Sequence, residues 1–106
     1  MRDDKYFGLT SVERELIISL IKQELFPDQK LKIWIFGSRA RRDNQRYSDV
    51  DLLLEIDPPS TLTTEQFVKM QSNLEESYIQ YKVDLVCSST IEESYRENIE
   101  RDKVLF

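Results

Sequence analysis

Histidine is absent from this chain of 106 residues, and cysteine occurs only once, at Cys87. Without histidine the chain cannot build a Ser-His-Asp triad, a Cys-His pair or a histidine-ligated zinc site. A single cysteine excludes an internal disulfide and a multi-cysteine zinc site. Any acid–base or metal chemistry must therefore rest on carboxylates, which prefer hard cations such as magnesium or manganese.

Long apolar runs are missing as well. The longest span three or four residues, as in Leu16–Ile18 and Ile33–Phe36, so no transmembrane helix is expected. The first six residues are mostly charged, which excludes an ordinary secretory signal and favours a cytoplasmic protein. A net charge of −5 disfavours general nucleic-acid binding, although a locally basic site for one nucleotide stays possible. The length predicts one domain over residues 1–106.

Helical and strand patterns alternate along the chain, which predicts an α/β fold with a sheet covered on at least one face. The sheet should have about three strands. The expected elements, in chain order, are a helix over about 11–25, a strand over 31–36, a short helical turn and loop within 38–48, a strand over 50–56, a helix after Thr63, a strand over 83–87 and a last helix opened by Ser89.

Capping boxes mark two helix starts, Thr10 with Glu13 and Thr63 with Gln66. Residues 1–9 are polar and are expected to be a loosely held lead-in. Apolar residues near the ends of the chain could form a partner surface or simply fray. They are Tyr6, Phe7, Leu105 and Phe106. The predicted inward helix faces are Phe67, Met70, Leu74 and Tyr78 in the helix after Thr63, and Ile91, Tyr95 and Ile99 in the last helix.

Gly37 is one of only two glycines, and it directly follows a predicted strand and precedes Ser38. Glycine lets a backbone approach a ligand closely, and unpaired N–H groups at a helix start bind phosphate. Four arginines follow within eight residues of this acidic chain, which indicates a local anion site. The alternative is a solvated turn that carries arginines. The four are Arg39, Arg41, Arg42 and Arg46.

Asp49 and Asp51 share one side of the strand over 50–56, about 6–7 Å apart. Strands disfavour aspartate, and two neighbouring carboxylates repel each other unless a cation lies between them. Asp84 is an isolated carboxylate in the strand over 83–87 and could meet the first two across the sheet. Alternatively, Asp49 belongs to a turn, and Asp84 pairs with an arginine. The functional interpretation is a magnesium site of three carboxylates.

These residues resemble a known pattern. Gly37-Ser38, ten residues, and then Asp49-Val50-Asp51 form the G-S-x10-D-x-D signature of the DNA polymerase β-like nucleotidyltransferase superfamily, and Asp84 fits its later third carboxylate. The surrounding residues resemble most closely the minimal nucleotidyltransferases. This group usually has glycine where the chain has Arg42. The resemblance implies the nucleotidyltransferase (polymerase β-like) fold, a small mixed sheet flanked by helices.

The resemblance also implies an activity, which is transfer of a nucleoside monophosphate from an NTP to a hydroxyl with release of pyrophosphate. Asp49 and Asp51 would hold magnesium or manganese ions. Asp84 would bind the catalytic metal or accept the proton of the attacking hydroxyl. Gly37 and Ser38 would cradle the β and γ phosphates, and Arg39 is expected to contact phosphate on position and charge alone.

Minimal nucleotidyltransferases are typically encoded beside a helical HEPN protein, an RNase toxin in characterised pairs. The resemblance therefore implies an ATP-dependent antitoxin that attaches AMP to a tyrosine of a HEPN partner in a hetero-oligomer. No binding to a nucleic-acid polymer or a membrane is expected. The alternatives are a non-catalytic binding antitoxin and nucleotidyl transfer to a small molecule held by a helical partner subunit. An aminoglycoside-modifying enzyme would need a second domain, for which the chain has no room.

Overall fold

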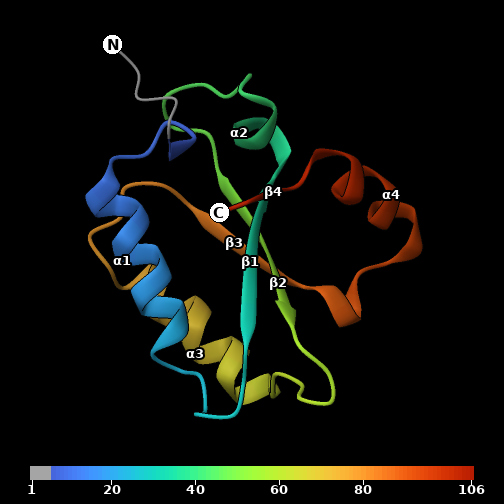
Figure 1. Cartoon of the computed structure of the whole chain (residues 1–106). Helices are drawn as coiled ribbons and strands as arrows, with labels where there is room; N and C mark the ends of the chain where they lie inside the picture. The colour runs from blue at the N-terminus through green and yellow to red at the C-terminus, as the bar shows by residue number, and fades with distance from the viewer. Residues whose placement is uncertain (1–5) are drawn as a thin grey trace.

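The computed structural model describes residues 6–106, which form a mixed β-sheet flanked by helices (Figure 1). The sheet has four strands in the order β3-β2-β1-β4; β1 pairs antiparallel with β2 and β4, and β2 pairs parallel with β3. The elements are α1 (Ser11–Lys22), β1 (Leu31–Phe36), α2 (Gly37–Arg41), β2 (Val50–Ile56), α3 (Thr64–Glu75), β3 (Val83–Cys87), the 3-10 helix η2 (Ser88–Thr90), α4 (Glu93–Asp102) and β4 (Val104–Leu105).

Three strands, β1, β2 and β3, have the bounds that the sequence predicts. The fourth was not expected. β4 comprises only two residues, which pair with Trp34 and Ile35 of β1, and a two-residue strand carries no readable alternation. Since α3 connects β2 to β3 as a crossover, these two strands lie parallel and start at the same edge of the sheet.

Both predicted capping boxes are present and begin α1 and α3. The first helix ends at Lys22, earlier than expected, because tighter turns follow it, with Leu25 N–H donating to the Lys22 carbonyl at 3.1 Å. The last helix begins after Glu92 instead of at Ser89. The reason is that residues 88–90 form η2 and Ile91 is extended, so the chain changes direction before α4.

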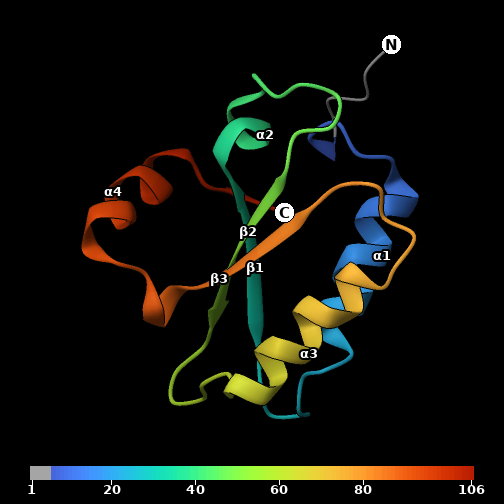
Figure 2. The same cartoon turned by 180° about the vertical axis from the view of Figure 1, so that it is seen from behind.

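α1 and α3 cover the same face of the sheet, and α4 lies on the opposite side (Figures 1 and 2). The core lies between the two helices and the sheet. Its fully buried members include Ile17 and Ile21 of α1, Leu52 and Leu54 of β2, and Met70 of α3. Among residues 6–106, no helix is both long and apolar enough to cross a lipid bilayer.

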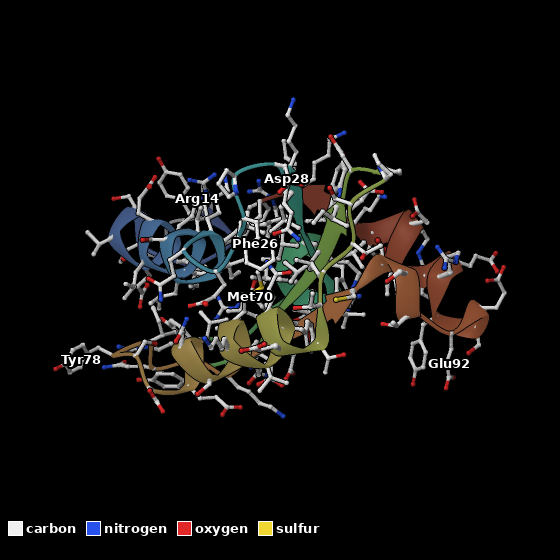
Figure 3. All side chains as sticks on the ribbon, turned by 90° about the horizontal axis from the view of Figure 1, so that it is seen from below. Arg14, Phe26, Asp28, Met70, Tyr78 and Glu92 are labelled. Carbon is white, nitrogen blue, oxygen red and sulfur yellow. The ribbon has the colours of Figure 1, made fainter. Side chains whose placement is uncertain are left out.

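Two of the predicted inward-facing residues point elsewhere. Tyr78 lies beyond the end of α3, is 98% exposed and projects away from the molecule, whereas Met70 points inward (Figure 3). Tyr95 of α4 is exposed, because that helix presents only Ile99 as a buried residue.

The apolar residues near the chain ends divide into two groups. Phe7 and Phe106 are buried and their rings lie 6.2 Å apart, so these two are core and not frayed ends. Leu105 is exposed, and Tyr6 is half-buried against the core. Leu9 is also fully buried, so the expected loose lead-in is instead packed from residue 6 onward. Residues 1–5, which were examined above for a secretory signal, lie outside the described residues.

Candidate active site

The register of β2 and β3 places two carboxylates side by side. Asp51 is the direct cross-strand partner of Asp84, and on its other side it pairs with Phe36, the last residue of β1. Neighbouring strands lie about 4.8 Å apart, and directly opposed residues point to the same face. Asp51 and Asp84 therefore share the sheet face opposite α1 and α3, which confirms the predicted meeting of these two strands' carboxylates.

Asp49 lies immediately before β2 and is exposed. The chain is tied to the neighbouring strand at this point, because Val50 N–H donates to the Lys82 carbonyl at 2.8 Å. The electrostatic influence of Asp49 reaches Asp51, whose pKa it raises. The three predicted carboxylates thus belong to one end of the sheet, where β2 and β3 begin and β1 ends.

Gly37 presses against Asp51. Its φ angle is +76°, in the left-handed region, and a Cβ placed on it would lie 2.6 Å from Asp51 Oδ2. Any side chain here would collide with the carboxylate. The backbone of the Gly37-Ser38 turn is therefore adjacent to Asp51, and the close approach expected of this glycine is toward the carboxylate itself.

The surroundings of Asp51 disfavour its charged form. Burial raises the pKa of Asp51 above its ordinary value, and repulsion from Asp84 and then Asp49 adds to the rise. Lys82 and Arg39 oppose the shift without cancelling it. A positive charge placed at Asp51 would relieve this repulsion, which is the property expected of a cation site.

The partner of Asp84 is a lysine and not the arginine considered as an alternative. Lys82 Nζ lies 3.7 Å from Asp84 Oδ1, and both side chains are at least partly exposed. The two residues share a face of β3 because they are two positions apart, and that spacing was the signal from which the pair could have been found. Within residues 6–106, no three acidic or cysteine side chains converge into a preformed metal cage.

A family model described as "Polymerase beta, Nucleotidyltransferase" matches residues 15–106, which include all four strands as well as Asp49, Asp51 and Asp84. The chain belongs to this nucleotidyltransferase family. It is accordingly an enzyme of the nucleotidyltransferase class, with the α/β fold of that family.

Two relatives extend the match. MntA of Haemophilus influenzae, named a probable protein adenylyltransferase, is 32% identical over 89 residues, which cover 84% of this chain and 75% of that protein. A Methanocaldococcus jannaschii protein, whose name gives the same activity in similarly provisional form, is 32% identical over 97 residues, covering 90% of this chain and 96% of that protein.

Solved structures confirm the nucleotidyltransferase fold. A chain of a toxin–antitoxin complex with AMP-PNP superposes with a TM-score of 0.66 at 23% identity, covering 86% of this chain and 69% of that one. A chain from the complex of a tri-AMPylated Shewanella oneidensis HEPN toxin with an MNT antitoxin gives 0.64 at 20% identity, covering 92% and 71%.

In this nucleotidyltransferase Arg39 has a structural position. Its side chain is 1% exposed, and its guanidinium donates to the Ser48 carbonyl at 2.9 and 3.1 Å and to the Phe7 carbonyl at 2.8 Å. These bonds tie the loop before β2 to the N-terminal segment. Contact between Arg39 and phosphate was predicted from position and charge alone, and it would require this buried network to open.

The other three arginines diverge instead of forming one anion site. Arg41 pairs with Asp43 at 3.2 Å and with Asp102 of α4 at 3.1 Å. Arg46 lies over the Tyr47 ring at 5.3 Å. Among the described residues, these separate contacts favour the alternative interpretation of the arginine cluster, a solvated turn that carries arginines.

Arg42 explains why its position usually carries glycine in the resembling group. It is the C-cap of α2 and has a φ angle of +64°, the left-handed conformation that helix ends favour and that glycine adopts without steric cost. Its side chain is exposed. The departure from glycine thus acts on backbone conformation, and the side chain points to solvent without narrowing the loop.

Proposed function

We propose that this nucleotidyltransferase moves AMP from ATP to a tyrosine hydroxyl of a HEPN-type partner protein, releasing pyrophosphate, and so acts as the antitoxin of a toxin–antitoxin pair. The observation that carries the proposal is the paired Asp51 and Asp84, with Asp49 beside them and Gly37 against them. The names of the two relatives support adenylyl transfer to protein, and the AMPylated toxin in the Shewanella complex supports the partner class.

The donor set fits a divalent cation of the magnesium type. Carboxylate oxygens are its preferred ligands. The pKa of Asp51 is raised first by burial and then by repulsion from Asp84 and Asp49, and a cation between these carboxylates would offset that repulsion. Asp49, Asp51 and Asp84 would hold the metal, in competition with Lys82 for Asp84. When bound, such ions neutralise phosphate charge and activate the attacking oxygen.

The residues of the chain have separable tasks in the transfer. The backbone of Gly37 and Ser38 would hold the terminal phosphates beside Asp51. The incoming hydroxyl oxygen forms a bond to the α-phosphorus while the bond from that phosphorus to the bridging oxygen of the β-phosphate breaks. We assign acceptance of the hydroxyl proton to a carboxylate oxygen of Asp84, whose side chain is 39% exposed and can be reached from solvent.

The decisive experiment incubates the purified protein with magnesium and α-phosphate-labelled ATP, with and without the candidate partner, which is the product of the neighbouring gene. Label should appear on the partner and vanish with EDTA or with Asp49→Ala/Asp51→Ala. The matched control is Asp28→Ala/Asp57→Ala, which removes two exposed carboxylates away from the site and should leave labelling unchanged.

Three outcomes discriminate among the functions. A stable complex without label on any protein, and without pyrophosphate release, would support a purely binding antitoxin. Pyrophosphate release without protein label would instead indicate a small acceptor. Label on the partner at a residue other than tyrosine would keep adenylyl transfer and correct the acceptor.

A further inference from the structure

Two tyrosines pack against each other at the end of the sheet that carries the carboxylates. The rings of Tyr47 and Tyr81 have centroids 6.2 Å apart and are inclined by 37°. Tyr47 lies just before β2 and Tyr81 just before β3. Since these strands are parallel and begin at the same edge, the segments that lead into them are neighbours. The pair therefore lies at the same edge of the sheet as Asp49 and Asp51.

Arg39 contacts both of the segments that carry the two tyrosines. The buried guanidinium of Arg39 lies 4.6 Å from the Tyr81 ring centroid, and it also donates to the carbonyl of Ser48, which follows Tyr47 directly. Tyr81 is half-buried against the core. Tyr47 is 62% exposed, and the guanidinium of Arg46 lies 5.3 Å from the centroid of its ring. A rigid aromatic surface is thus presented to solvent next to a site for phosphates.

We propose that the Tyr47 ring is the stacking platform for the base of the bound nucleoside triphosphate, with Tyr81 as its support and Arg46 able to cover the base from outside. This inference rests on the proposed function and adds to it the group that receives the nucleobase. An aromatic ring stacks on the π face of any base, and arginine can contribute a cation–π contact.

The position of Tyr47 suits that occupant. Tyr47 precedes Asp49 by two residues, so their Cα atoms are no more than about 7 Å apart. A nucleotide whose phosphates lie at Gly37 and Asp51 has its base within reach of this ring. Because stacking does not read hydrogen-bonding edges, the platform favours purines by their larger face without selecting sharply among them.

The test compares binding of magnesium-ATP with binding of magnesium tripolyphosphate, which has the same phosphate chain but no base, by titration calorimetry. Tyr47→Ala should weaken ATP binding about tenfold or more and leave tripolyphosphate binding unchanged. Tyr47→Phe, which keeps the ring, should bind ATP within about twofold of the unaltered protein. The control is Tyr95→Ala, which removes a tyrosine of matching exposure, 63% against 62%, from α4.

The possible failures are distinct. Equal weakening of ATP and tripolyphosphate by Tyr47→Ala would show that the ring only supports the loop, and it would overturn the platform. ATP binding that Tyr47→Ala leaves intact would overturn the platform and leave the proposed function standing. If the unaltered protein bound neither compound, the proposed function would fall and the platform with it.

Discussion

The two faces of β2 differ in chemistry although they alternate along the same seven residues. Val50, Leu52 and Leu54 are buried against the layer of α1 and α3 and belong to the main core. Asp51, between two of them, points to the other face, where it meets Asp84. The apolar side chains on one face of β2 therefore stabilise the fold, and the charged side chain of Asp51 lies on the other face. Substitutions on the two faces can therefore change stability and activity separately.

The contrast is not complete, because Leu53 on the carboxylate face is buried as well. This residue lies further along β2, and alternation puts it on the face opposite α1 and α3, the side of the sheet on which α4 lies (Figure 1). The opposite face is therefore open at the beginning of β2 and covered along its middle. The candidate site occupies the open end, where a ligand can reach the strands.

The largest expected effect is on the carboxylate face. Asp51→Asn removes one charge but almost no volume, and it should lower nucleotidyl transfer by about a thousandfold, since metal-assisted charge stabilisation is worth several kcal/mol. The free energy of unfolding should not fall, because the substitution removes a charge whose burial, and then its repulsion from Asp84 and Asp49, raises the pKa of Asp51. Labelled-ATP assays and urea unfolding test the two expectations, and retained transfer in magnesium would contradict the metal assignment.

The reciprocal change lies one residue away on the core face. Leu52→Ala should reduce the free energy of unfolding by about 2–5 kcal/mol, because Leu52 is fully buried and the substitution leaves a cavity. Transfer per folded molecule should stay close to the original well below the melting temperature. A large loss of kcat in a sample shown to be folded by circular dichroism would mean that the two faces are coupled.

A third substitution is expected to affect both nucleotidyl transfer and the stability of the fold. Gly37→Ala places a methyl group against Asp51 Oδ2 and imposes a left-handed conformation on alanine. Displacement of the carboxylate should cost about a hundredfold in transfer, and the backbone should lose about 1 kcal/mol of stability. Kinetics and thermal unfolding of the same preparation measure both, and unaltered transfer would show that the turn does not position Asp51.

The smallest change tests a position on neither face. Arg42→Gly relieves the left-handed C-cap of α2 and should stabilise the fold by about 0.5–1 kcal/mol, with transfer unchanged. A denaturant titration would detect the gain. If transfer fell instead, the exposed Arg42 side chain would have a part in nucleotide binding that its direction toward solvent does not suggest.

The strands could be predicted to the residue because alternation and the breakers Gly37 and Pro58 act locally. The same alternation predicted that Asp51 and Asp84 face the same way, and the parallel pairing brings them together. The metal and nucleotide roles of these residues stay predictions that the proposed experiments address.

What could not be predicted depends on distant parts of the chain. Arg39 is buried because the carbonyls of Phe7 and Ser48 converge on it, and no local pattern indicates that convergence. The predicted start of the last helix was wrong because Ser89 and Glu92 have the spacing of a capping box, whereas Ser89 lies in η2 and Glu92 is itself the N-cap of α4. β4 depends on the end of the chain returning to β1.

The parallel pairing of β2 and β3 has a consequence for the timing of synthesis. Asp51 and Asp84 are separated along the chain by the rest of β2 and by all of α3, and they become neighbours only when that crossover has closed. Non-local pairings of this kind form late in folding. A nascent chain on the ribosome can therefore complete the Gly37 turn and still lack the pairing of Asp51 with Asp84 until β3 has emerged.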